Sequence, residues 1–190
     1  MSKFILNKIL PLFFLAFILL CFNCDGRDSI KKNHTQVLEE NNLIQEFSEQ
    51  VTYIPETNLE TVTDTLLSSG YKIHIKTYFN MDSSVLKTRH QDSLNLKSYY
   101  RNGLADVIIS TDDNVLFSKT ITKTFIRENL SKPIEGLKSF ILKSIWIDEN
   151  TALNGTVIAI QMEYCIPETQ DCLTFKLSVK TSGEYQLKQL

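Results

Sequence analysis

Two runs near the C-terminus, 156–166 and 172–180, alternate apolar and polar residues with the period of two that a β-strand imposes. If Cys165 lies opposite Cys172, four opposed pairs on one face are apolar, and two of the pairs on the other face are polar. A slip of one residue would mix the two faces, so the pattern predicts this register independently of the cysteines. The apolar pairs are Tyr164–Leu173, Met162–Phe175, Ile160–Leu177 and Ile158–Val179, and the polar pairs are Glu163–Thr174 and Gln161–Lys176.

The same alternation recurs from residue 60 onward, and Gly and Asn pairs typical of turns separate the runs. Strands that follow one another through short turns must pair antiparallel. The sequence therefore predicts a mainly β fold, an antiparallel β-sandwich or partly open barrel of about eight strands with one or two short helices. The runs include 61–67, 71–79, 93–101, 104–111, 115–123, 140–148 and 185–190, besides the two C-terminal ones.

Between these strands, three segments are predicted to be helix or connection. Apolar residues at helical spacing predict a helix over 35–51. The polar stretch 80–92 is expected to be a connection, and Asn102-Gly103 is expected to form a turn that ends the strand before it. Residues 124–136, which contain Pro133, are predicted to form a short helix followed by a loop.

The first 24 residues have the layout of a secretory signal. Lys3 and Lys8 precede an apolar run of 14 residues, 9–22, and the chain then becomes polar. A membrane-spanning helix usually needs about 20 apolar residues. This run is shorter and contains Pro11, so it indicates export of the chain.

A cysteine at the polar edge of the signal suggests a bacterial lipoprotein, in which the thiol of that cysteine carries the lipid. Cys24 is the preferred lipidation residue and Cys21 is the alternative, although neither follows a small residue. An ordinary cleaved signal and an uncleaved N-terminal anchor are two further interpretations. The expected organisation is a signal peptide over 1–23, a tether over 24–34 and one extracytoplasmic domain over 35–190.

Composition restricts the partners and the compartment. Removing 1–23 takes away two lysines and no acid, so the formal charge moves from −2 to −4. A mildly acidic domain with scattered lysines offers no footprint for nucleic acid. Cys165 and Cys172 are then the only cysteines besides the anchor. In an oxidising compartment such a pair more often forms a disulfide than a metal site.

Few residues suggest chemistry. His90 and Asp92 lie two apart in a polar stretch and could orient a general base for a hydrolase, but no motif supplies a nucleophile. His74 falls among the polar residues of an alternating strand and is expected on a solvated face. Residues 112–114 (Asp-Asp-Asn) are better explained as a hairpin tip than as a calcium loop. No metal site, cofactor or catalytic residue is assigned, and an enzyme is the less favoured interpretation.

Three stretches carry a resemblance: 70–82 (GYKIHIKTYFNMD), 114–123 (NVLFSKTITK) and the turn 165–172 (CIPETQDC) with its flanking strands. In these the chain resembles a family of uncharacterised lipoproteins from Bacteroidota that share a domain of unknown function. The resemblance covers most of 59–187. It implies an anchored extracytoplasmic domain and supplies no catalytic residues.

These observations together favour a lipid-anchored protein of the cell envelope that faces the periplasm or the cell surface and acts as a binding or structural module. Its expected partners are membrane lipid, through the N-terminal anchor, and an envelope protein or ligand. Two alternatives remain. One is an envelope hydrolase that uses His90 and Asp92, and the other is a carrier of an apolar ligand in the mouth of a barrel.

Overall fold

The structure is a computed structural model and describes residues 33–41, 43, 48–91, 94–148 and 156–190. The chain divides into two units, 1–48 and 49–190. The predicted signal peptide, Cys21 and Cys24 lie outside the described residues. Within the described residues, no helix has the length and hydropathy that crossing a membrane would require.

The first unit contains one described helix, α2 (His34–Glu40). It falls within the predicted range 35–51 apart from its first residue. The C-terminal part of that prediction is wrong, because Glu49–Val51 begin a strand instead. Their neighbour is a strand that follows more than 40 residues later, and a helical pattern in the local sequence does not reveal such a pairing.

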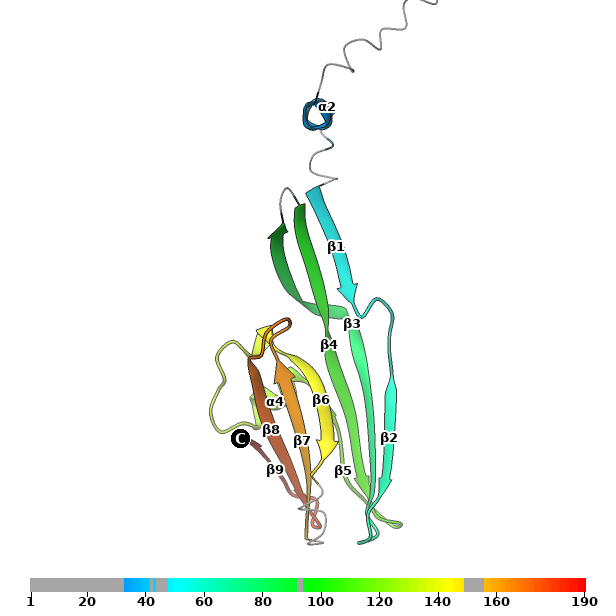
Figure 1. The fold of residues 1–190 in the computed structure, drawn as a ribbon. Coiled ribbons are helices and arrows are strands. Elements are labelled where there is room, and N and C mark those ends of the chain that lie inside the picture. Colours follow the sequence, from blue (N-terminus) through cyan, green and yellow to red (C-terminus); the bar gives the residue numbers. More distant parts are fainter. Residues whose placement is uncertain (1–32, 42, 44–47, 92–93, 149–155) are drawn as a thin grey trace, which may run out of the picture. The chain divides into compact units, whose positions relative to one another are not determined.

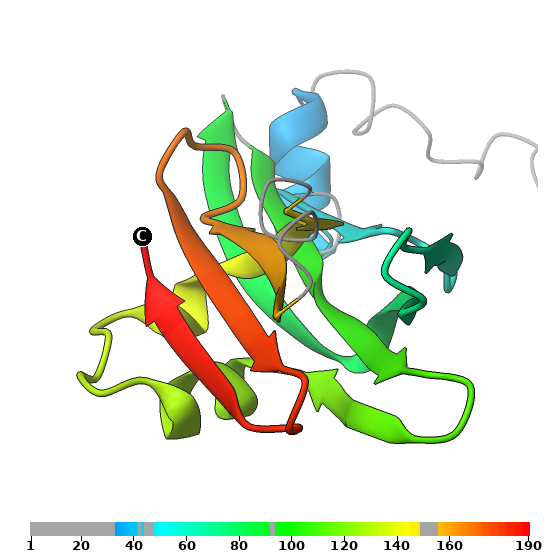
Figure 2. The ribbon, with the colours of Figure 1, turned by 90° about the horizontal axis from the view of Figure 1, so that it is seen from below.

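Residues 49–190 form two β-sheets that face each other (Figures 1 and 2). The mainly β sandwich predicted from the sequence is therefore confirmed, and the described strands do not close into a barrel. The first sheet contains β1 (Glu49–Ile54), β2 (Thr61–Leu66), β3 (Lys72–Gln91), β4 (Leu94–Ser110) and β5 (Val115–Ile121), and the second contains β6 (Ile141–Ile147), β7 (Val157–Cys165), β8 (Cys172–Lys180) and β9 (Tyr185–Gln189).

The first sheet is built on the long hairpin of β3 and β4. The predicted connection 80–92 and the predicted turn at Asn102-Gly103 are both wrong, because the two strands run through these residues. The polar stretch is accommodated by a β-bulge between Asn80 and Ser84, which leaves three residues of β3 without partners. A glycine at 103 is needed for a different reason. A Cβ atom there would lie 2.8 Å from the carbonyl oxygen of Leu142 in β6.

The other strands of the first sheet pair with this hairpin over different parts of its length. β2 pairs antiparallel with the first residues of β3, and β5 pairs antiparallel with the last residues of β4, as predicted. β1 instead pairs with the first half of β4, and it does so in parallel. This exception to the antiparallel prediction arises because β2 and β3 intervene between β1 and its partner.

The second sheet has the order β6-β7-β8-β9 and is antiparallel throughout. The predicted register of β7 and β8 is confirmed at each pair from Ile158–Val179 to Tyr164–Leu173. Cys165 lies opposite Cys172, and the two form a disulfide with Cα atoms 4.1 Å apart. The apolar face of this hairpin supplies fully buried side chains to the core: Ile160, Met162, Tyr164, Phe175, Leu177 and Val179.

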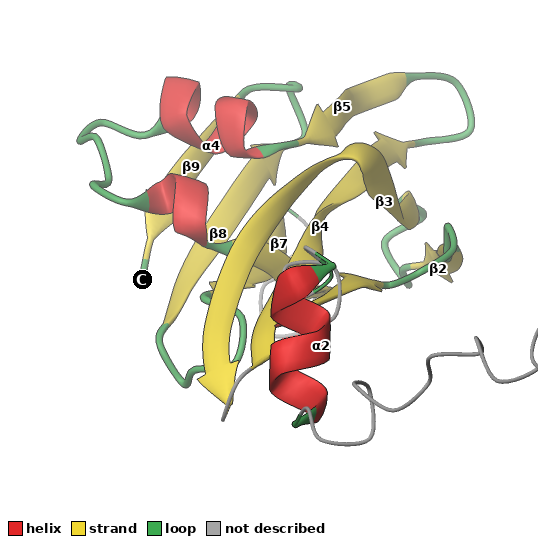
Figure 3. Ribbon diagram, turned by 90° about the horizontal axis from the view of Figure 1, so that it is seen from above, coloured by secondary structure: helices red, strands yellow, loops and turns green. Residues whose placement is uncertain are grey.

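Facing residues of the first sheet complete the core, among them Ile75, Val107 and Ile109. Helix α4 (Lys123–Asn129) adds Phe125 and Ile126 to it. This helix confirms the short helix predicted over 124–136, and it lies beside β9 (Figure 3). Its first turn is capped by Thr122, whose hydroxyl oxygen accepts a hydrogen bond from the Phe125 N–H at 2.9 Å.

Candidate functional site

A histidine–carboxylate pair lies on an exposed face of the first sheet. Nδ1 of His74 in β3 is 2.6 Å from Oδ1 of Asp64 in β2, and the two residues are register partners. The sequence predicted a solvated position for His74, and its side chain is 38% exposed. The partnership with Asp64 was missed. It follows from the hairpin geometry once the turn at Ser69-Gly70 fixes the register.

Such a pair can orient an imidazole as a general base, provided that a nucleophile or water lies within reach of its other nitrogen. Asp64 is the only hydrogen-bond partner that His74 has among the described residues. The carboxylate is 73% exposed, so water screens the pair. The arrangement therefore fits a cross-strand contact on a solvated face better than a catalytic dyad.

Of the predicted pair of His90 and Asp92, only His90 is among the described residues. His90 is exposed near the end of β3, opposite Asn95 of β4. Asp92 lies outside the described residues. The hydrolase that would use these two residues thus stays a prediction.

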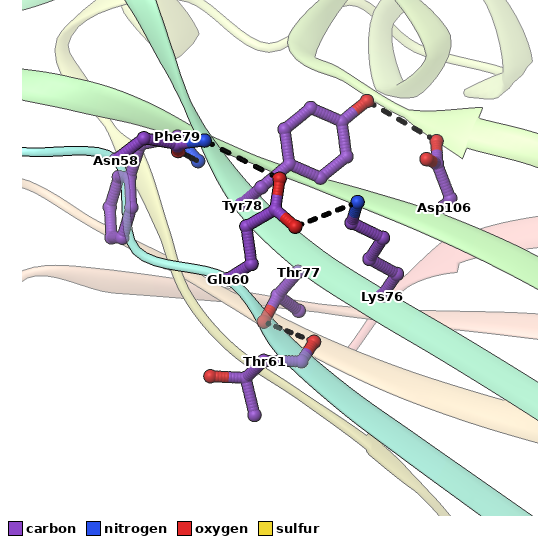
Figure 4. Close-up of polar contacts among 8 residues, drawn as sticks. All are labelled: Asn58, Glu60, Thr61, Lys76, Thr77, Tyr78, Phe79 and Asp106. Carbon is purple, nitrogen blue, oxygen red and sulfur yellow. Dashed lines mark hydrogen bonds and ion pairs between the residues drawn. The ribbon is translucent and has the colours of Figure 1, made fainter.

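A second polar group, the Lys76 cluster, comprises Glu60, Lys76, Tyr78 and Asp106, which Figure 4 shows, together with Thr120. Nζ of Lys76 lies 2.8 Å from Oε2 of Glu60. The hydroxyl groups of Tyr78 and Thr120 donate to Oδ1 of Asp106 at 3.3 and 2.6 Å. Each charge in the cluster therefore has a partner.

The pKa shifts in the Lys76 cluster favour a charged lysine, an ionised Glu60 carboxylate and a protonated Tyr78 hydroxyl. The hydrogen bond between Lys76 and Glu60 raises the pKa of the lysine and lowers the pKa of the carboxyl group. Burial raises the pKa of Tyr78, which keeps its hydroxyl group protonated as a donor. The lowered pKa makes the Glu60 carboxylate a weak base, and the lysine and the phenol both stay protonated, so we assign the cluster to surface stabilisation.

A cleft of about 250 Å³ lies between β6 and the neighbouring parts of β2, β3 and β4. Its walls combine hydroxyl groups with aliphatic and aromatic side chains, among them Tyr78 and Phe79, and Lys143 also lines it. A carrier of an apolar molecule needs a larger and more apolar space, since ligand pockets usually enclose about 300–1,000 Å³. The lining residues include Thr61, Thr63, Thr77 and Ser144 as well as Ile75, Leu142 and Ile145.

The disulfide removes one possible metal site. Ligand atoms of Glu163, Cys165 and Cys172 lie within 4.8 Å of one another, a spacing that could suit a metal ion. The two sulfur atoms are bonded to each other and so cannot serve as thiolate ligands. The hairpin tip at 112–114 is confirmed as a turn between β4 and β5, and Asp112 there pairs with Lys72 at 2.8 Å.

An exposed apolar surface lies on the extension sheet, which we define as β1 with the paired segments 84–91 of β3 and 94–101 of β4. Register places Tyr53, Tyr99 and Leu86 side by side across the three strands. The rings of Tyr53 and Tyr99 stack with centroids 5.0 Å apart. Leu86 is 47% exposed, Tyr53 is 43% exposed, and the nearby Val51 is 49% exposed.

Two polar anchors fix the extension sheet. Arg101 donates hydrogen bonds to the carbonyl groups of Pro55 and Met81, and its guanidinium lies 4.8 Å from the centre of the Tyr53 ring. On β3 and β4, Arg89 and Tyr100 both contact Glu168 of the β7–β8 turn.

Glu168 is the one described residue other than glycine with a positive φ, 65°. This conformation costs about 1–2 kcal/mol for a residue with a side chain. Its carboxylate accepts a hydrogen bond from the Tyr100 hydroxyl at 2.6 Å and pairs with Arg89 at 2.5 Å. These contacts lower the pKa of Glu168 and offset the conformational cost. The disulfide-bonded turn thus holds the extension sheet through a single side chain.

The sequence did not single out the residues of the extension sheet, because β1 lies more than 40 residues before its partner and the stretch 80–92 was predicted to be a connection. Neither a family model nor a curated protein matches this chain. The resemblance to lipoproteins from Bacteroidota therefore stays a prediction.

Proposed function

We propose that the protein is a lipid-anchored binding module of the cell envelope and that the extension sheet binds an extended segment of a protein partner. The N-terminal segment supports export, and Cys24 supports lipid attachment, with Cys21 as the alternative residue. The disulfide between Cys165 and Cys172 suits an oxidising compartment.

The observation that carries the proposal is the exposed edge and face of β1. Among the described residues, β1 pairs with β4 on one side only, so the backbone groups of its other edge are open to an added strand. Natural edge strands usually carry proline, inward-pointing charges or lysine that prevent such pairing. β1 has the sequence EQVTYI and contains no proline or lysine. Val51 and Tyr53 offer apolar contacts to the side chains of that strand.

Crosslinking in intact cells, followed by capture of the protein, tests the binding surface. We expect Val51→Lys to remove the specific crosslinked partner, because it places a charge on the exposed face of β1. Val62→Lys is the matched control, since Val62 is 51% exposed on β2. Equal partner recovery with both variants would contradict the proposed surface.

Anchoring is tested separately. We expect an inhibitor of lipoprotein signal peptidase to leave the signal peptide attached, so that the protein has a larger mass than its mature form. Cys24→Ala should prevent lipidation, whereas Cys21→Ala should leave it intact. An unchanged mass with the inhibitor and with both variants would rule out the lipid anchor and leave the binding surface to its own test.

A further inference from the structure

A pocket of about 350 Å³ lies between the start of α4 and the short 3₁₀-helix η1 (Leu137–Ser139). We call it the α4 pocket. Three of its lining side chains are basic and none is acidic, although the chain as a whole carries a net charge of −2. The lining residues are Lys123, Thr124, Arg127, Ile134, Gly136, Leu137 and Lys138.

Lys123 is the least exposed of the three basic side chains. Its ammonium group donates a hydrogen bond to the carbonyl oxygen of Lys138 at 2.8 Å, and it has no carboxylate partner among the described residues. Burial without a counter-ion lowers its pKa to about 8. A cation in this state gains more from a bound anion than a fully solvated lysine does, because part of its hydration has already been lost.

Arg127 and Lys138 are exposed, and neither forms an ion pair within the described part of the chain. Several other basic residues of this domain have a carboxylate partner, although exposed lysines such as Lys119 and Lys188 also lack one within the described residues. Lys72, Lys76, Lys97, Lys176, Lys180 and Arg89 each lie within 4.0 Å of a carboxylate oxygen. The α4 pocket therefore gathers three positive charges that the protein itself leaves without counter-ions.

We propose that the α4 pocket binds the phosphate group of a small molecule. A phosphate carries about two negative charges near neutral pH and accepts several hydrogen bonds. Arg127 can donate two parallel hydrogen bonds to it, and the two lysines act as compact positive charges. A volume of about 350 Å³ leaves room for a small organic group beside the phosphate.

Calorimetric titration of the full chain in detergent, at constant ionic strength, tests the proposal with inorganic phosphate and glycerol phosphate as probes. We expect saturable binding of both. Replacing Lys123 or Arg127 with glutamine should weaken binding about tenfold, since a hydrogen bond to a charged group contributes about that much. Lys188→Gln is the control, because Lys188 is an exposed lysine on β9 outside the pocket.

A second measurement separates a bound ligand from general attraction to a basic surface. We expect the pKa of the Lys123 amine, followed by NMR of its side-chain carbon, to rise when phosphate is added and to stay unchanged with acetate at the same ionic strength. Three results would overturn the proposal: no saturable binding, equal weakening by Lys188→Gln, or an unchanged pKa of Lys123 at saturating phosphate.

Discussion

The contact between β4 and β6 at Gly103 gives a sharp test of the fold. Gly103→Ala would place a methyl group 2.8 Å from the carbonyl oxygen of Leu142 and 3.1 Å from its Cβ atom. The nearest atom belongs to the backbone, so a change of rotamer cannot relieve the clash. β6 would have to retreat by about 0.6 Å to restore an ordinary contact of 3.4 Å.

Overpacking of this kind costs about 1–3 kcal/mol. Alanine also lowers the conformational entropy of the unfolded chain, which stabilises the folded state by about 0.4–1 kcal/mol. We therefore expect the free energy of unfolding to fall by about 1–2 kcal/mol, measured by chemical denaturation. The amide resonances of Leu142 and Lys143 should also shift, because the displacement is centred on β6.

Gly70→Ala serves as the control, since Gly70 has a positive φ of 83° and no atom near its added Cβ. It should lower stability through backbone strain and leave the β6 resonances unchanged. If Gly103→Ala stabilised the protein and left β6 unperturbed, the close approach of β4 and β6 would be refuted.

Three further predictions concern the second sheet. Replacing both cysteines of the disulfide with serine should lower the free energy of unfolding by up to about 2.5 kcal/mol, and reductant should then have no further effect. Because Tyr100 and Arg89 lower the pKa of Glu168 below 4.5, its contribution is complete above that pH and is lost as the pH falls through the folded-state value; Glu168→Gln should flatten the acid limb of a stability–pH curve. Tyr164→Phe should leave the free energy of unfolding unchanged or raise it by about 1 kcal/mol, because the Tyr164 hydroxyl is buried without a hydrogen-bond partner among the described residues. A lower free energy of unfolding in chemical denaturation would contradict this and show that the hydroxyl has a hydrogen-bond partner.

The hairpin of β7 and β8 could be predicted to the residue because its information is local. Alternating side chains and one cysteine pair determine both its faces and its register. The segment around Asn102-Gly103 was predicted wrongly for the opposite reason. A glycine next to asparagine usually marks a turn, but here the glycine is required by Leu142, which lies about 40 residues away. Nothing in the local sequence distinguishes the two uses.

The candidate sites also differ in whether local sequence is enough to predict them. The pairing of His74 with Asp64 could have been predicted, because the turn between β2 and β3 determines the register of the two strands. The neighbouring positions of Tyr53, Tyr99 and Leu86 could not be predicted, because they depend on a parallel pairing of β1 with β4 across two intervening strands. The three charges of the α4 pocket also come from two separate segments, whose approach depends on how α4 and η1 pack on the core.

The parallel pairing of β1 has a consequence for the order of events during folding. The ion pair between Glu49 and Lys97 joins positions 48 residues apart, and β4 is the only strand that pairs with β1 in the described chain. Closing so long a loop costs entropy before any pair can form. β1 precedes its partner strand along the chain, so we expect it to remain unpaired until β4 has been made and the β3–β4 hairpin has formed.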